Sequence, residues 1–169
     1  MSTEPQSTPA LSSTPAITET LKASLAQLAV QYGQRAAEQQ TLTRSLSELV
    51  RRAPIMCSAQ ATVRSALQTM NDAGVRTVIA IDDDQRPVGL FTLVDLMRRV
   101  VLAERGLDTP LGEVMTAPAM TLDADATAHE AMHLMAERGI RQIVVVDAGR
   151  VQGVVNERDL FALQRVSMR

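Results

Sequence analysis

Two short segments of the sequence carry residues suited to binding a small polar ligand. In the first, Thr92 is followed three residues later by Asp95, directly after the apolar run 89–91. A hydroxyl and a carboxylate at this spacing are typical of a helix N-terminus, where each can satisfy a backbone N–H group. The same groups suit a nucleotide, because helix N–H groups and a hydroxyl bind phosphate, and a carboxylate accepts from two ribose hydroxyls. A single copy leaves both interpretations open.

The segment occurs twice, which favours the functional interpretation. Asn156 and Asp159 follow a second apolar run, 153–155, and Asp159 lies 64 residues after Asp95. The repeat is wider than this motif, because A-P-I-M at 53–56 matches A-P-A-M at 117–120. Two related copies in one chain predict two similar units that share a core and are not stable alone.

Each copy predicts the element order β-α-β-β-α. Thr62 and Thr127 suit the N-cap of the first helix in each copy, and Gly74 and Gly139 suit its C-terminal end. Apolar β-branched runs follow at 77–81 and 142–146 and predict strands covered on both faces. We expect the two copies to pack face to face about a pseudo-twofold axis, so that their strand-to-helix turns face a common cleft.

The residues before the first copy predict a long helix. Leu21 and Leu28 lie seven residues apart, as do Leu25 and Tyr32, which gives a stripe of the coiled-coil kind. We expect one helix, bent near Gly33, whose stripe either packs on the chain's own globular part or pairs with a second copy in a homodimer. The predicted order is a disordered tail at 1–16, this helix at 17–48, repeat 1 at 49–105, a linker with a short helix at 106–116, and repeat 2 at 117–166.

Composition excludes several classes of function. The net charge of −2 and an aromatic content of 2% argue against nucleic acid as a partner. No apolar stretch approaches the roughly 20 residues that span a bilayer, and the N-terminus does not resemble a secretory signal, so no membrane partner is expected. The single cysteine, Cys57, is compatible with a reducing compartment, and we expect a cytoplasmic location.

From about residue 49 to 166, the chain resembles a tandem pair of cystathionine-β-synthase (CBS) domains. The resemblance rests on the repeat, the order of elements and the G-h-h-T-x-x-D ending of the first copy. It implies an α/β (α+β) fold and a non-catalytic regulatory module. It also implies an adenosine-containing ligand such as AMP, ADP, ATP or S-adenosylmethionine in the cleft, with no cofactor required.

The resemblance implies two ligand sites, each with a ribose-binding aspartate, a phosphate-binding residue, a backbone segment near the base and an arginine from the other repeat. The first site would use Asp95, Thr92, the segment Pro54, Ile55 and Met56, and Arg141. The second site would use Asp159, Asn156, the segment Pro118, Ala119 and Met120, and Arg76.

Departures from the family pattern refine these expectations. Asn156 replaces the expected hydroxyl, so the second site is expected to be the weaker one. Thr77 and Gln142 stand where a second basic residue is common, which leaves few positive charges for a triphosphate. We therefore expect a monophosphate, a diphosphate or an adenosyl group without phosphate. A ligand-free dimerisation scaffold is the alternative.

Residues near the end of the sequence show a second, less specific family resemblance. Residues 159–165 are similar to the exit of CBS pairs in bacterial signal-transduction proteins that continue into a nucleotidyltransferase-like domain. We therefore expect this chain to be part of a longer protein, whose further domain the module would regulate through differential ligand affinity.

One motif points to a different chemistry. His129, Glu130 and His133 form H-E-x-x-H, the zinc-protease signature, and leave a zinc metalloenzyme as a further alternative. The matching positions of the first copy are Arg64 and Gln68, which are typical of a solvent-facing surface. We therefore predict surface histidines and no metal site.

Overall fold

The computed structural model describes residues 14–166, except for the side chains of 14–18, 34, 37–41 and 163–166. Most of the expected N-terminal tail, residues 1–13, lies outside this part. Helix α1 (Thr14–Leu42) begins at Thr14, so positions 14–16 are helical and not part of a tail.

The prediction of one helix as far as residue 48 was wrong, because α1 ends at Leu42 and a separate helix, α2 (Leu46–Leu49), follows. The break lets the backbone pair with repeat 2. Ser45 forms a β-bridge with Thr127, and the Leu46 N–H donates to the Ala126 carbonyl at 2.8 Å. Gly33 does not interrupt α1, which runs through it.

Repeat 1 contains one three-stranded sheet with the order β1-β2-β3, in which β2 pairs in parallel with β1 and antiparallel with β3. Its two helical segments precede β2 and follow β3. The elements are β1 (Met56–Ser58), α3 (Val63–Ala73), β2 (Thr77–Ile81), β3 (Pro87–Thr92), α4 (Leu93–Asp95) and the π-helical η1 (Leu96–Val101).

Repeat 2 has the same arrangement, with the sheet order β4-β5-β6 and the same parallel and antiparallel pairs. A short 3-10 helix, η2 (Leu111–Glu113), precedes it. The elements are β4 (Thr121–Asp123), α5 (Ala128–Arg138), β5 (Gln142–Asp147), β6 (Arg150–Asn156) and α6 (Glu157–Val166). The predicted order β-α-β-β-α is confirmed in both repeats.

Side chains at helix ends confirm the predicted helix boundaries. Thr62 accepts from the third N–H group of α3, and Thr127 does the same for α5. Gly74 and Gly139 end these helices in the left-handed conformation, each at φ 63°, which favours glycine because a Cβ is strained there.

The two sheets face each other across the pseudo-twofold axis. Ile79 and Leu90 of repeat 1 form one buried apolar cluster with Val144 of repeat 2. At the edge of this cluster, the Gln142 amide donates to the Thr77 hydroxyl at 3.1 Å. Thr77 and Gln142 are the first residues of β2 and β5, so equivalent positions meet and the axis passes between them.

The segment before each repeat packs in the core of the other repeat. Leu46 and Leu49 of α2 belong to the core of repeat 2, and Leu111 and Val114 belong to the core of repeat 1. All four are at most 5% exposed. Burying each side chain contributes about 1.5–3 kcal/mol. Each repeat therefore obtains part of its core from a segment that leads into its partner.

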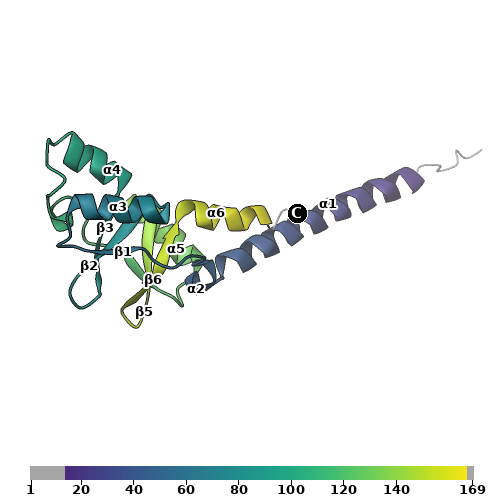
Figure 1. Ribbon diagram of the computed structural model, residues 1–169. Helices are drawn as coiled ribbons and strands as arrows, with labels where there is room; N and C mark the ends of the chain where they lie inside the picture. The colour runs from purple at the N-terminus through teal and green to yellow at the C-terminus, as the bar shows by residue number, and fades with distance from the viewer. Residues whose placement is uncertain (1–13, 167–169) are drawn as a thin grey trace, which may run out of the picture.

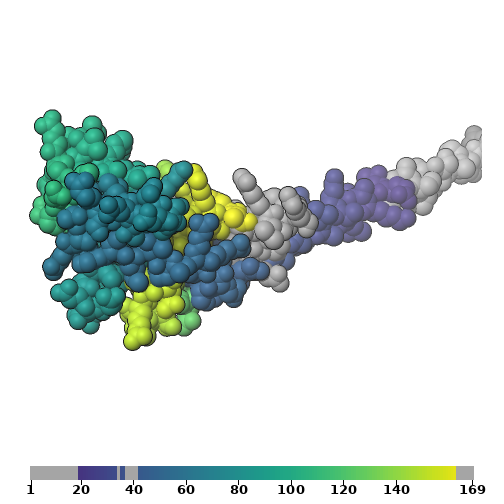
Figure 2. Space-filling view, in the orientation of Figure 1, coloured from purple at the N-terminus to yellow at the C-terminus, as the bar shows by residue number. Residues whose placement is uncertain are grey.

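Helix α1 runs away from the globular part, as Figures 1 and 2 show. Leu21, Leu25, Leu28 and Tyr32 are between 47% and 67% exposed. The alternative in which this stripe packs on the chain's own globular part is therefore wrong for these four residues. Among the described residues, no helix has the length and apolar character needed to cross a membrane.

Candidate functional site

The two strand-to-helix turns lie on either side of the pseudo-twofold axis. Thr92, at the end of β3, pairs with Thr77, and Asn156, at the end of β6, pairs with Gln142. Since the side chains of Thr77 and Gln142 are hydrogen-bonded to each other, each turn lies one strand from the axis. The fold thus brings the two predicted motifs to a common edge.

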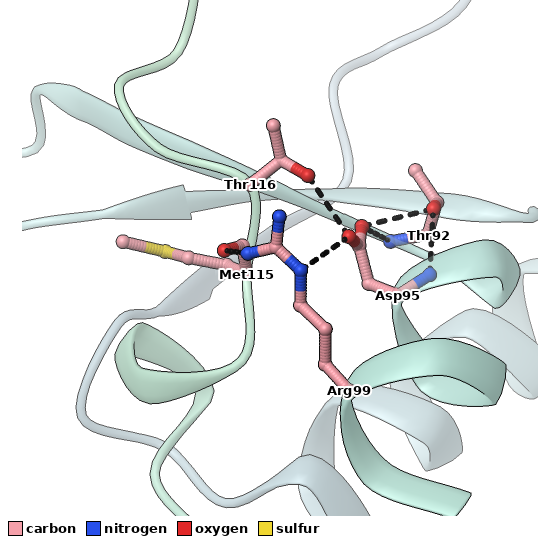
Figure 3. Close-up of polar contacts among 5 residues, drawn as sticks. All are labelled: Thr92, Asp95, Arg99, Met115 and Thr116. Carbon is pink, nitrogen blue, oxygen red and sulfur yellow. Dashed lines mark hydrogen bonds and ion pairs between the residues drawn. The ribbon is translucent and has the colours of Figure 1, made fainter. Parts of the chain in front are cut away.

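At the first turn, Thr92 and Asp95 form a capping box (Figure 3). The Asp95 Oδ2 atom accepts from the Thr92 N–H and from the Thr92 hydroxyl, both at 2.9 Å. The Asp95 N–H donates in return to the Thr92 Oγ1 atom at 3.2 Å. Asp95 is only 6% exposed. The capping interpretation of the motif is confirmed.

The second oxygen of the Asp95 carboxylate is also occupied. The Thr116 hydroxyl donates to Oδ1 at 2.9 Å, and the Arg99 Nε atom lies 3.5 Å from the same oxygen. The Arg99 Nη1 group also donates to the Met115 carbonyl, so one guanidinium contacts both the carboxylate and the linker backbone (Figure 3). Both oxygens of the buried carboxylate therefore have protein partners.

The segment between the repeats lies against β3, beside Gly89 and Leu90. Thr116 and Leu90 exchange backbone hydrogen bonds of 2.8 and 2.9 Å. A Cβ at Gly89 would lie 2.5 Å from the Met115 Sδ atom, so a side chain at this position would force the Met115 side chain to move. Sequence reasoning missed Thr116 and Arg99, because neither belongs to the repeated motif.

The second turn is capped by an amide. The Asp159 Oδ2 atom accepts from the Asn156 N–H at 2.9 Å, and the Asp159 N–H donates to the Asn156 Oδ1 atom at 3.0 Å. Asn156 thus replaces the hydroxyl of Thr92 in accepting from the helix. Asp159 is half-buried, and its Oδ1 atom has no hydrogen-bonding partner among the described residues.

The two arginines predicted to bind phosphate, Arg76 and Arg141, are exposed. Within the part of the chain that is described, neither the Arg76 nor the Arg141 guanidinium forms an ion pair or a hydrogen bond. The Arg141 carbonyl accepts from the Glu157 N–H at 3.0 Å, which places Arg141 beside the first turn of α6. These side chains are free to contact an anion.

The predicted base-binding segments lie at the same end of the two sheets. The Ile55 carbonyl accepts from the Ile79 N–H, and the Met120 carbonyl accepts from the Val144 N–H, both at 2.9 Å. The Ala119 N–H reaches across to the Val88 carbonyl of repeat 1 at 3.3 Å. Segment 118–120 therefore contacts both repeats. The remaining members of the two segments are half-buried or exposed: Pro54, Met56 and Pro118.

Among the described residues, no group of three or more His, Cys, Asp or Glu side chains is placed to hold a metal ion. The H-E-x-x-H motif therefore forms no metal site there. His129 and His133 are exposed, as predicted. Glu130 belongs to the α5 capping box, where the Thr127 N–H and hydroxyl donate to its Oε2 atom at 2.7 and 3.1 Å. These hydrogen bonds, the backbone one foremost, hold the pKa of the Glu130 carboxyl below its usual value.

Two β-α-β-β-α repeats about a pseudo-twofold axis, with a capped carboxylate at each strand-to-helix turn, define a tandem α/β module. The family model for the CBS domain matches residues 46–102 and 111–165, which is more than half of the chain. The chain therefore belongs to the CBS-domain family and contains two CBS domains in tandem.

Sequence relatives share the module and differ in what surrounds it. An uncharacterized protein of Methanopyrus kandleri is 29% identical over 122 residues, which cover 71% of this chain and 62% of that protein. Arabinose 5-phosphate isomerase GutQ of Escherichia coli K12 is 32% identical over 102 residues, which cover 60% of this chain and 32% of the isomerase. The chain thus spans less than two thirds of either relative.

Solved structures agree with the fold. The CBS domain of a membrane protein from Sphaerobacter thermophilus has a TM-score of 0.73 at 22% identity and covers 80% of this chain and 97% of that one. A CBS domain protein from Pyrobaculum aerophilum, solved in complex with AMP, has a TM-score of 0.63 at 28% identity and covers 69% and 89%.

Proposed function

We propose that this CBS pair is a non-catalytic sensor that binds an adenine nucleotide or S-adenosylmethionine between its repeats. The observation that carries the proposal is the convergence of two capped carboxylates on one edge of the module, beside the uncommitted arginines Arg76 and Arg141. The Pyrobaculum aerophilum relative, which was solved with AMP, supports the choice of an adenosine ligand.

Each group has a chemical role in this proposal. A carboxylate accepts hydrogen bonds from both hydroxyls of a ribose, which a motif aspartate would do here. The N–H groups at a helix start favour a phosphate, and Thr92 or Asn156 would add a polar side chain there. Arg141 would neutralise phosphate at the first site and Arg76 at the second. The base would lie against 54–56 or 118–120.

Charge favours a small anionic group in each site. The single arginine that the sequence predicts for each site offers little compensation for a triphosphate, because Thr77 and Gln142 are neutral and already bonded to each other. We therefore propose AMP, ADP or S-adenosylmethionine in preference to ATP. A calorimetric titration in which ATP binds much more tightly than AMP would contradict this preference.

A thermal-shift screen of AMP, ADP, ATP and S-adenosylmethionine tests the proposal. A ligand at 100 times its dissociation constant stabilises the folded state by about 2.7 kcal/mol, which raises the melting temperature measurably. We expect the shift to shrink in the double variant Arg76→Gln, Arg141→Gln. The matched control is Arg138→Gln, an exposed arginine at the end of α5.

The competing function is a scaffold without ligand. It is favoured by one observation, the complete set of protein partners around the Asp95 carboxylate. A scaffold would show no thermal shift with any of these ligands, and its oligomeric state would not respond to them. The screen therefore separates the two functions.

We further propose that the module is a homodimer and that a second copy covers the stripe on α1. Leu21, Leu25, Leu28 and Tyr32 are exposed at heptad spacing, and a second copy presents the same stripe, so one twofold interface covers both. Sedimentation at tens of micromolar should give a dimer that Leu25→Glu dissociates.

The control for the dimer is a change on another exposed apolar side chain. Met97, on η1, is 49% exposed, and Met97→Glu should leave the α1 dimer intact. A monomeric wild type would contradict the dimer. Dissociation by Met97→Glu but not by Leu25→Glu would move the interface to η1.

The regulated partner is proposed to be a further domain of a longer protein, of the nucleotidyltransferase-like kind, in the cytoplasm. A ligand can change such a domain only by the difference between its affinities for two arrangements of the pair. The test is whether the ligand of the thermal-shift screen changes the activity of the longer protein.

A further inference from the structure

The two motif carboxylates are not equivalent. Asp95 has protein partners on both oxygens, and its side chain is 8% exposed. Asp159 is half-buried, and among the described residues only its Oδ2 atom is engaged, by the Asn156 N–H. A ribose diol needs two acceptor positions on a carboxylate. Within the described part of the chain, the Asp159 Oδ1 atom is available to a ligand, whereas both Asp95 oxygens are occupied.

The sequence explains why only one turn is closed. Arg99 and Thr116, the residues that occupy the Asp95 Oδ1 atom, have no counterparts of the same type in repeat 2. The residue matched to Arg99 is Leu163, and the residues matched to the Met115–Thr116 pair are Arg51 and Arg52. Where the first turn has a hydroxyl that donates to its carboxylate, the segment beside the second turn therefore has two arginines.

The segment before repeat 1 passes the second turn as the linker passes the first. A Cβ at Gly153 would lie 2.5 Å from the Val50 Cγ1 atom and 3.5 Å from the Arg52 carbonyl oxygen, as one at Gly89 would contact Met115. Arg51 and Arg52 are exposed and form no ion pair with any described residue. The segment that passes β6 beside Gly153 thus carries two arginines without an ion pair, and the Asp159 Oδ1 atom has no partner among the described residues.

We propose that the ligand fills the Asp159 site first, and that Thr116 and Arg99 form a latch that closes the Asp95 site. This inference rests on the proposed function, and it reverses the order of the two sites that the sequence favours. A ligand at Asp95 must displace the Thr116 hydroxyl and the Arg99 guanidinium from Oδ1, because Oδ2 is held by the helix cap.

The latch connects the first site to the position of the linker. Thr116 lies in the segment that joins the repeats, and the Arg99 guanidinium also holds the Met115 carbonyl of that segment. Displacing the Thr116 hydroxyl from Asp95 removes one contact that fixes the linker to repeat 1, and moving the Arg99 guanidinium away removes its contact with the Met115 carbonyl as well. Thr116 and Arg99 are therefore positioning residues that couple occupancy of the first site to the connection between the repeats.

Calorimetric titration with AMP tests the order of the sites. The wild type should bind one AMP per chain, and Asp159→Asn should weaken this binding at least tenfold while keeping an oxygen to cap α6. The double variant Thr116→Val, Arg99→Gln should bind a second AMP, or bind it at least tenfold more tightly than the wild type. The matched control Thr121→Val, Arg98→Gln changes an exposed threonine and an exposed arginine and should behave as the wild type.

A second readout separates a latch from a merely structural contact. The Thr116 N–H donates to the Leu90 carbonyl at 2.8 Å, and its hydrogen exchange reports on the linker. In the latch variant this exchange should accelerate several-fold without ligand, because the two side chains that AMP would displace from Asp95 in the wild type are already absent. A purely structural role would lower the melting temperature and leave the number of bound AMP molecules unchanged.

The outcomes distinguish this inference from the proposed function. Binding that Asp159→Asn leaves intact, two equal sites in the wild type, or a latch variant that still binds one AMP would overturn the latch while the sensor stands. If neither the wild type nor the latch variant binds AMP, ADP, ATP or S-adenosylmethionine, the sensor fails and the inference fails with it.

Discussion

Each repeat takes part of its core from a segment outside it, so removing one such side chain should destabilise both repeats by a measurable amount. Leu111 precedes repeat 2 in the chain, is 0% exposed, and packs in the core of repeat 1. Leu111→Ala removes this side chain from a close-packed core. Substitutions of this kind cost about 2–5 kcal/mol, because the lost burial adds to the cavity left behind. For a chain of this size, that corresponds to a melting temperature lower by about 4–20 °C.

The assay is urea unfolding followed by circular dichroism and, separately, by hydrogen exchange in each repeat. Because each core contains a segment from outside its repeat, Leu111→Ala should destabilise repeat 1 and repeat 2 together in one transition. Leu46→Ala, the matching change in the core of repeat 2, should have the same effect. Leu102 is 72% exposed, and Leu102→Ala is the control that should change the free energy of unfolding by less than about 0.5 kcal/mol.

Two results would refute the reasoning. A loss below about 1 kcal/mol for Leu111→Ala would mean that the interrepeat segment does not complete the core. Two separate unfolding transitions, with only repeat 1 destabilised, would mean that the repeats are independent units.

Further predictions concern close contacts and caps. Gly153→Ala should lower the free energy of unfolding in urea by about 1–3 kcal/mol. This loss should exceed that of Gly89→Ala, because Val50 is β-branched and cannot move aside as the flexible Met115 side chain can. Equal losses would contradict this prediction. Thr127→Ala should cost about 1 kcal/mol at pH 7 through loss of the α5 cap. Because folding lowers the pKa of Glu130, the stability that the Glu130 carboxylate gains from Thr127 is present above its unfolded-state pKa and is lost as the pH falls through its folded-state pKa. Thr127→Ala should therefore lower the free energy of unfolding less at pH 3 than at pH 7.

Local signals in the sequence predicted most of the fold. Thr62 and Thr127 cap helices, and Gly74 and Gly139 end them, because these properties depend on a few neighbouring residues. The repeat then predicted the two units, and the apolar runs predicted their central strands. The solvent-facing side of the H-E-x-x-H helix also followed from comparing the two copies.

Contacts between segments far apart in the chain were not predictable in this way. The end of α1 at Leu42 depends on pairing between Ser45 and Thr127, which the helical pattern of residues 17–48 does not reveal. The contacts of Thr116 and Arg99 with Asp95 occur in one repeat only, so the repeat pattern gives no signal for them.

The central claim is that an adenosine ligand binds at the strand-to-helix turns. Titration of AMP into isotopically labelled protein, followed by the chemical shifts of backbone N–H groups, tests it most directly. We predict saturable changes centred on Asn156, Asp159 and Arg76, with none along the exposed part of α1. Spectra that stay unchanged with AMP, ADP, ATP and S-adenosylmethionine at millimolar concentration, or changes confined to surfaces away from both turns, would contradict the claim and leave the module as a scaffold.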